Sequence, residues 1–252
     1  MHAKTFYGTV GIFLVAGVIV ATAGGYAFAK LAEIVKRGST QSYDDAILTW
    51  IHGHQTPGLT TFMREITYLG TGSVVIVVVG VAALFLWHTE HKHSARLLLA
   101  STIGGIILNN ALKLLFHRDR PSLFEWGTSV ASSSFPSGHA MSATVVYGTV
   151  AYLVARLQKH RWARVLTLLT AFTLIIMICF TRLYLGVHYP SDVVGGIVVG
   201  LAWAGFCMAT LEASLVLGRR RAPVAVVGER PAPTEPVTAG SMAAEAAATQ
   251  SG

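Results

Sequence analysis

The sequence predicts an all-α fold, an integral membrane bundle of six transmembrane helices with short amphipathic helices in the outer loop between spans one and two. Three observations lead to this prediction. Apolar residues make up 53% of the 252 residues, and Asp, Glu, Lys and Arg only 12%, about half the charged fraction of a soluble domain. The mean hydropathy is +0.56. The uncharged runs 7–29 and 66–87 are each long enough to cross a bilayer as a helix.

The composition also excludes several classes of protein. The apolar content argues against a soluble enzyme and against a disordered chain, and two cysteines are too few for a disulfide-stapled secreted fold. The net charge of +7 does not indicate nucleic acid, because the basic residues are spread between apolar segments instead of forming one stripe. We therefore expect no nucleic-acid partner, and the bilayer explains the charge better.

Six apolar spans follow one another along the chain, at residues 7–29, 66–87, 97–116, 139–157, 165–183 and 192–217. The first ends in Ala27-Phe28-Ala29, which resembles a signal-peptide cleavage site. Its apolar stretch is longer than the roughly 7–15 residues of a signal peptide, so an uncleaved anchor is the favoured interpretation. Six crossings place both termini on one side. Most basic residues outside the cluster described below lie on that side, which predicts cytoplasmic termini.

Two short helices are expected in the outer loop between spans one and two. The sequence Ser42-Tyr43-Asp44-Asp45 resembles a capping box, and Thr56-Pro57 is typical of a second helix start. These helices either lie on the outer membrane surface or pack as a hairpin over the bundle. At the other end of the chain, residues 222–252 lack periodicity and predict a disordered cytoplasmic tail, so residues 1–221 form the membrane domain.

Ionisable residues gather where the spans end on the outer side, and inside a membrane protein such residues are candidates for function. Lys113, Arg118 and Arg120 close span three, Ser137 and His139 open span four, Arg182 closes span five, and His188 and Asp192 open span six. Basic side chains near a Ser-Gly turn at a helix start favour an anion, and phosphate is the obvious one. The two histidines supply a nucleophile or base and a proton donor, while Asp192 is spaced to hold the imidazole of His188.

The same residues fall into three motifs that resemble those of a known family. Lys113-(six residues)-Arg120-Pro121, Pro136-Ser137-Gly138-His139 and Arg182-(five residues)-His188-(three residues)-Asp192 resemble the signature of the type 2 phosphatidic acid phosphatase superfamily. The family often has Ser where this chain has Thr181, which keeps the hydroxyl. The resemblance implies a mechanism through a phosphohistidine without metal or cofactor. His188 would attack phosphorus, Asp192 would orient it and His139 would protonate the leaving oxygen. The phosphate would be held by Lys113, Arg120, Ser137, Gly138 and Arg182.

The expected function is hydrolysis of a lipid phosphate or pyrophosphate at the outer leaflet of the bacterial cytoplasmic membrane. Candidate substrates, by resemblance, are undecaprenyl pyrophosphate, phosphatidylglycerophosphate and phosphatidic acid. A lipid phosphotransferase with the same site is one alternative. A lipid or solute transporter is another, although no charge lies mid-bilayer, where transport sites usually are. Soluble vanadate-dependent haloperoxidases resemble the same motifs, but the membrane spans argue against that activity.

Two further patterns lie outside the three motifs. Gly196 and Gly200 form a Gly-x-x-x-Gly pattern, which predicts close helix packing within the bundle, with a homodimer face as the alternative. Arg118, with its neighbours His117 and Asp119, is expected to lie in a solvated loop, with assistance to phosphate binding as the alternative for Arg118.

Overall fold

The computed structural model describes residues 3–125 and 132–221, and every regular element in these ranges is a helix. The helices are α1 (Ala3–Lys36), α2 (Gln41–His52), α3 (Pro57–Tyr68), α4 (Gly72–His88), α5 (Lys92–Leu115), α6 (Gly138–Leu157), α7 (Arg161–Tyr184) and α8 (Pro190–Arg221). The predicted all-α membrane bundle is confirmed. The predicted disordered tail, residues 222–252, lies outside the described residues.

Five of the described helices are long and apolar enough to cross a membrane: Thr9–Lys36, Lys92–Leu115, Gly138–Leu157, Arg161–Tyr184 and Pro190–Leu217. The predicted second span has a different form. It consists of α3 and α4, which meet at a bend of 50° and count as a sixth span only when taken together. We call this bend the α3–α4 elbow (Thr67–Gly72).

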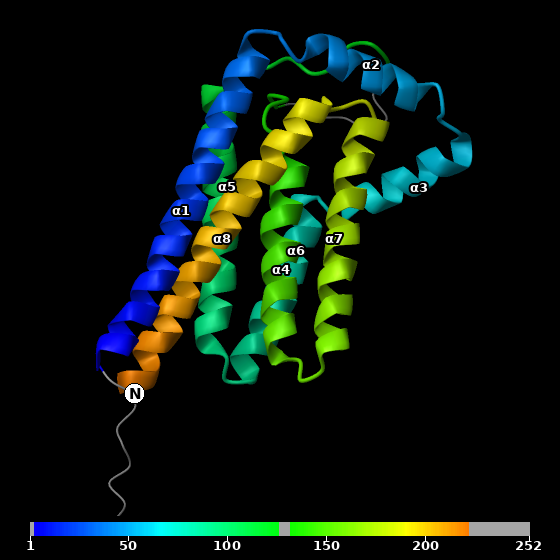
Figure 1. Ribbon diagram of the computed structural model, residues 1–252. Coiled ribbons are helices and arrows are strands. Elements are labelled where there is room, and N and C mark those ends of the chain that lie inside the picture. Colours follow the sequence, from blue (N-terminus) through cyan, green and yellow to red (C-terminus); the bar gives the residue numbers. More distant parts are fainter. Residues whose placement is uncertain (1–2, 126–131, 222–252) are drawn as a thin grey trace, which may run out of the picture. The chain divides into compact units, whose positions relative to one another are not determined.

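The helices that carry the predicted site residues place them at one end of the bundle. In Figure 1, α5 and α7 end there, α6 and α8 begin there, and α2 lies across the same end. α2 packs on the bundle through Leu48 and Ile51, while Tyr43 and Trp50 are exposed on its other face. Ile51 joins a buried cluster with Tyr184 and neighbouring residues of the α7–α8 connection. α2 therefore packs over the bundle, as the hairpin alternative predicts, whereas α3 belongs to the bent second span.

The predicted start of α2 was wrong and the predicted start of α3 was correct. α2 begins at Gln41 after Thr40, so Ser42 lies inside the helix and is not its N-cap. Asp44 is turned toward the bundle and buried. α3 begins at Pro57, and the Leu59 backbone N–H donates to the Thr56 hydroxyl at 3.4 Å, as expected of an N-cap.

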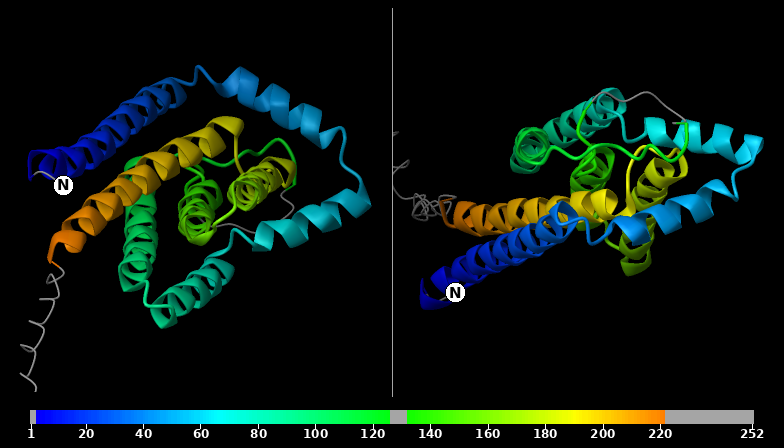
Figure 2. Two further views of the ribbon diagram at one scale, coloured as in Figure 1. Left: turned by 60° about the horizontal axis from the view of Figure 1, so that its bottom comes forward. Right: turned by 90° about the horizontal axis from the view of Figure 1, so that it is seen from above.

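Small residues let three helices approach one another closely. A Cβ added at Gly200 of α8 would lie 2.8 Å from the Cβ of Thr144 in α6. A Cβ at Gly24 of α1 would lie 2.4 Å from the Cβ of Ala202 in α8. α1 and α8 accordingly run side by side in both views of Figure 2. The glycines of α8 thus serve packing within the bundle, and the homodimer stays a prediction.

Candidate active site

The loop before α6 is hydrogen-bonded to the first turn of α8. The Ser134 hydroxyl donates to Oδ2 of Asp192, and the Ser137 backbone N–H donates to the Asp192 carbonyl at 3.0 Å. One turn further along α8, a Cβ at Gly196 would lie only 2.5 Å from the Ser137 carbonyl oxygen. The position therefore requires glycine. As a result, Ser137 and Gly138, which open α6, lie directly beside the start of α8.

Lys113 and Arg120 converge on the same loop from its other side. Nζ of Lys113 donates to the Ser132 hydroxyl at 3.0 Å and to the Ser133 carbonyl at 2.9 Å. Nε of Arg120 donates to the Ser132 carbonyl at 2.8 Å. Nη1 of Arg120 donates to the Val187 carbonyl at 2.7 Å and lies 3.3 Å from Nε2 of His188. The two cations of the first motif and the histidine of the third therefore meet at this loop.

His188 is a buried imidazole between a carboxylate and a guanidinium. Its side chain is 2% exposed, and Nδ1 lies 3.5 Å from Oδ2 of Asp192, which is fully buried. Burial lowers the pKa of His188 to about 4, although the carboxylate of Asp192 acts in the opposite direction. The ring is therefore neutral near pH 7. Nδ1 faces Asp192 and Nε2 faces Arg120, so the lone pair on Nε2 is directed toward the cationic side of the site.

The α3–α4 elbow supports the other two predicted residues. Nη1 of the buried Arg182 donates to Oγ1 of Thr67 at 2.6 Å, and the Thr181 hydroxyl donates to the same oxygen at 3.0 Å. Three residues later, a Cβ at Gly70 would lie 2.8 Å from Cδ2 of His139. Any side chain at Gly70 would push against the imidazole. The elbow thus contacts both Arg182 and His139.

Arg118 is not in a solvated loop, and the prediction for this residue was wrong. Its side chain is 14% exposed, and Nη1 donates to Oδ1 of Asp192 at 2.6 Å while Nη2 donates to Oδ2 of Asp44 at 2.9 Å. The guanidinium lies 4.1 Å from the ring centroid of Tyr189. Asp44 also accepts from the Ser191 backbone N–H at 3.0 Å and from its hydroxyl at 2.6 Å. We call Arg118, Asp44, Ser191 and Asp192 the carboxylate network.

The cations of the candidate site are of two kinds: Arg118 is paired with carboxylates, and the others bind neutral oxygens. Burial opposes the charge of Arg118, yet Asp192 and Asp44 keep its pKa raised above the usual value. Burial lowers the pKa of Arg120. Within the described residues, Lys113, Arg120 and Arg182 form no salt bridge and bind neutral oxygens instead. Among the described residues, three positive charges at this end of the bundle therefore have no carboxylate partner, an arrangement suited to binding an anion.

The structure brings all eight predicted site residues to one end of the bundle, and it adds three that sequence reasoning missed. The added residues are Asp44, Ser134 and Ser191. A signal for Asp44 is present in the sequence, because it occupies positions i, i+4 and i+7 of α2 together with the buried Leu48 and Ile51. In the described parts of the chain, no group of three or more His, Cys, Asp or Glu residues is placed to hold a metal ion.

Comparison with known proteins identifies the family. A model described as the PAP2 superfamily matches residues 94–215, which include Lys113, Asp192 and the site residues between them. The chain is 34% identical to phosphatidylglycerophosphatase B of Bacillus subtilis, over 69% of this chain and 86% of that protein. The chain belongs to the PAP2 superfamily. It is also 29% identical to undecaprenyl-diphosphatase BcrC of Bacillus subtilis, over 60% of this chain and 75% of that protein.

A solved PAP2 structure has the same fold. The crystal structure of a transmembrane PAP2 type phosphatidylglycerolphosphate phosphatase from Bacillus subtilis covers 80% of this chain and 96% of its own, with a TM-score of 0.68 and 28% identity. The named PAP2 relatives are phosphatases. The chain is accordingly a multi-pass membrane protein and an enzyme of the phosphatase class.

Proposed function

We propose that this PAP2 protein hydrolyses the phosphate or pyrophosphate group of a membrane lipid at the outer face of the bacterial cytoplasmic membrane. One observation carries the proposal. Among the described residues, Lys113, Arg120 and Arg182 have no carboxylate partner, and they lie at the same end of a bundle of apolar helices as the buried, neutral His188. Such a position brings a phosphate headgroup to the three cations while the rest of the lipid stays among the helices.

In the first step, Nε2 of His188 attacks phosphorus. A bond forms between nitrogen and phosphorus, and the bond from phosphorus to the leaving oxygen breaks. Asp192 stabilises the positive charge that develops on the ring, because its Oδ2 lies 3.5 Å from Nδ1. The remaining phosphate oxygens carry negative charge, which Lys113, Arg120 and Arg182 stabilise together with Ser137 and Gly138 at the start of α6.

His139 transfers the protons. It gives a proton to the leaving oxygen of the lipid as the phosphohistidine forms. In the second step it takes a proton from a water molecule, whose oxygen attacks phosphorus and releases inorganic phosphate from His188. The sum of the two steps is one water consumed per phosphate released. Neither step requires a metal ion.

The orientation of the site follows from charge. Apart from the cluster at the site, basic residues are more numerous on the side of the bundle that holds the termini. The positive-inside rule assigns that side to the cytoplasm, and the site faces outward. The substrate is then a lipid of the outer leaflet.

The proposal is tested with purified enzyme in detergent and a panel of phosphatidic acid, phosphatidylglycerophosphate and undecaprenyl pyrophosphate. Release of inorganic phosphate is measured with and without EDTA and without any added acceptor. We expect release from at least one lipid, undiminished by EDTA. Turnover only with an added alcohol acceptor would instead indicate a phosphotransferase. Complete loss in EDTA, restored by Mg²⁺ or Zn²⁺, would refute the mechanism.

A further inference from the structure

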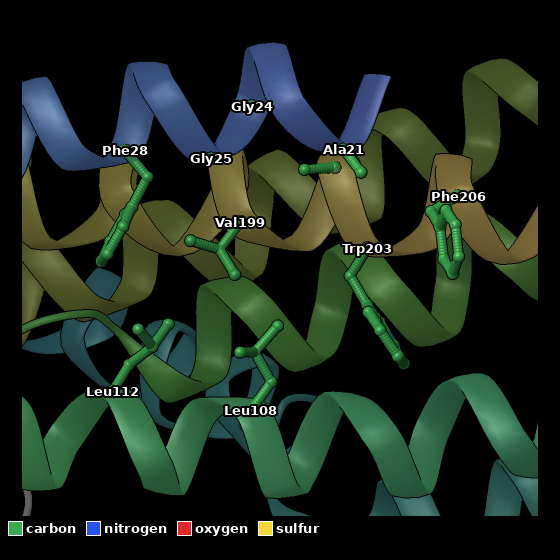
Figure 3. A pocket seen from close by; sticks show the side chains of 10 residues that line it. Ala21, Gly24, Gly25, Phe28, Leu108, Leu112, Val199, Trp203 and Phe206 are labelled. Atoms are coloured by element: carbon green, nitrogen blue, oxygen red, sulfur yellow. The ribbon is translucent and has the colours of Figure 1, made fainter. Parts of the chain in front are cut away.

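A second feature of the bundle is a cavity of about 340 Å³ between α1, α5 and α8. Its ten lining residues are all Ala, Gly, Leu, Val, Phe or Trp. Figure 3 shows Phe28 of α1, Leu112 of α5 and Val199 of α8 pointing into it. The polar atom Nε1 of Trp203 is already engaged, donating to the Ser101 carbonyl at 2.8 Å. The cavity therefore offers no partner to a polar ligand, and its surface is suited to a hydrocarbon chain.

The cavity adjoins the phosphate side of α5. Leu108 and Leu112 line the cavity, and the next residue in each case, Asn109 and Lys113, lies about 100° further around the helix. A Cβ at Gly138 would lie 3.2 Å from Nδ2 of Asn109 and 3.7 Å from Cε of Lys113. One stripe of α5 thus faces the cavity and the neighbouring stripe faces the start of α6.

The end of the cavity nearest the active site is formed by Phe28 of α1, which packs against the loop before α6. Phe28 lines the cavity and stacks on Phe135 with ring centroids 5.4 Å apart. Phe135 is 1% exposed and stands two residues before Ser137. From Phe28 to Ala21 the cavity runs along α1 for about 10 Å, away from this loop. Its long direction leads from the site toward the middle of the bilayer.

We infer that this cavity binds the hydrocarbon chain of the lipid whose phosphate is held at Lys113. The inference rests on the proposed function and adds where the chain of the substrate lies. The chain enters between α1 and α5, below Phe28, and the headgroup reaches the cations of the loop. The lipid is thereby selected by its chain as well as by its phosphate.

Two adjacent glycines of α1 support this assignment in different ways. Gly24 is needed for packing, because a Cβ there would meet Ala202 at 2.4 Å. Gly25 also lines the cavity, but a Cβ there would meet nothing within 4 Å. A glycine inside a helix is destabilising relative to alanine, and packing does not require one at this position. Open space at Gly25 is what a bound chain requires.

The test is to fill the cavity with the Gly25→Phe variant of the full-length enzyme. The control is Gly11→Phe on the same helix, where a Cβ also meets nothing within 4 Å but which is not among the residues lining the cavity. The specificity constant kcat/KM is measured for dioleoyl phosphatidic acid and for 4-nitrophenyl phosphate, which has no chain. Gly25→Phe should lower the constant for the lipid by about tenfold or more and leave that for the aryl phosphate within about twofold. Gly11→Phe should change neither.

The ratio of the two constants does not depend on the fraction of folded enzyme, so partial misfolding does not obscure the result. If Gly25→Phe yields no folded protein, Gly25→Leu replaces it, with the same expectation for the ratio. An unchanged ratio would overturn the inference and would indicate that the cavity holds only a bilayer lipid or a helix contact. A wild-type enzyme that hydrolyses the aryl phosphate but none of the lipids would refute the proposed function itself.

Discussion

Removing Arg118 should destabilise the outer end of the bundle more than removing any other cation of the site. Its guanidinium donates to Asp192 at 2.6 Å and to Asp44 at 2.9 Å, and these two carboxylate side chains are 0% and 3% exposed. Arg118→Ala leaves both charges buried with neutral donors only. Breaking a buried ion pair by removing one partner costs about 3–5 kcal/mol. A typical domain is stable by about 5–15 kcal/mol, so the loss is a large fraction of the total.

The measurement is the free energy of unfolding in detergent, with Arg120→Ala as the matched control. Arg120 comes from the same loop but donates to the carbonyls of Ser132 and Val187 and lies near His188. Its removal leaves no carboxylate unpaired, and we expect a loss of about 1 kcal/mol. Arg120→Ala should instead reduce phosphatase activity, because a cation of the proposed phosphate site is lost.

A double-mutant cycle separates the ion network from general damage. Asp44→Ala and Arg118→Ala remove the two partners of one contact, so the double variant should lose at least about 1 kcal/mol less than the sum of the single losses. Additive losses would contradict the argument. A stability loss for Arg118→Ala no larger than that for Arg120→Ala would contradict it equally.

Three further outcomes are expected. His188→Ala should abolish turnover and any acid-labile phosphoenzyme. His139→Ala should slow turnover of the lipid by about 10²–10⁴-fold, and turnover of 4-nitrophenyl phosphate by less, because the leaving group of that substrate needs no proton. The reverse pattern would exchange the roles of the two histidines. Attack requires unprotonated His188, and its pKa is lowered to about 4, so kcat/KM should fall only as the pH drops toward 4; an acid limb near pH 6.5 would disagree. A cysteine at Leu123, which is 44% exposed, should react with an impermeant maleimide on intact cells, and one at Glu90 only after lysis; the opposite result would reverse the orientation.

The spans and the catalytic motifs could be predicted because each is encoded within a short stretch of sequence. An apolar run long enough to cross a bilayer is read from the run itself. His188 and Asp192 are four residues apart around Pro190, so a helix beginning at that proline brings them together without help from the rest of the chain. The bend between α3 and α4 was not predicted, because residues 66–87 form one uncharged apolar run, and the contact of Gly70 with His139 joins distant parts of the chain.

The carboxylate network could not be predicted in the same way, since it joins residues 74 positions apart in the sequence. Arg118 stands among His117, Asp119 and Arg120, and such a stretch usually forms a solvated loop. The sequence signal for this network lies in Asp44, the partner of Arg118. Asp44 lies on the apolar face of an amphipathic helix, and a carboxylate there must be neutralised or paired when that face is buried.

The division of charges supports the proposed phosphate site. The two buried acids near these cations are already bound: Asp192 by Arg118, Ser134 and the Tyr189 backbone, and Asp44 by Arg118 and Ser191. Among the described residues, the Ser137 hydroxyl and Nε of Arg182 are buried without a hydrogen-bond partner. A buried polar group left unpaired costs about 1–3 kcal/mol, so these two atoms lower the stability of the protein when no ligand is bound. In the proposed function a phosphate accepts a hydrogen bond from each of them, so that the stability given up at the site becomes binding energy for the substrate.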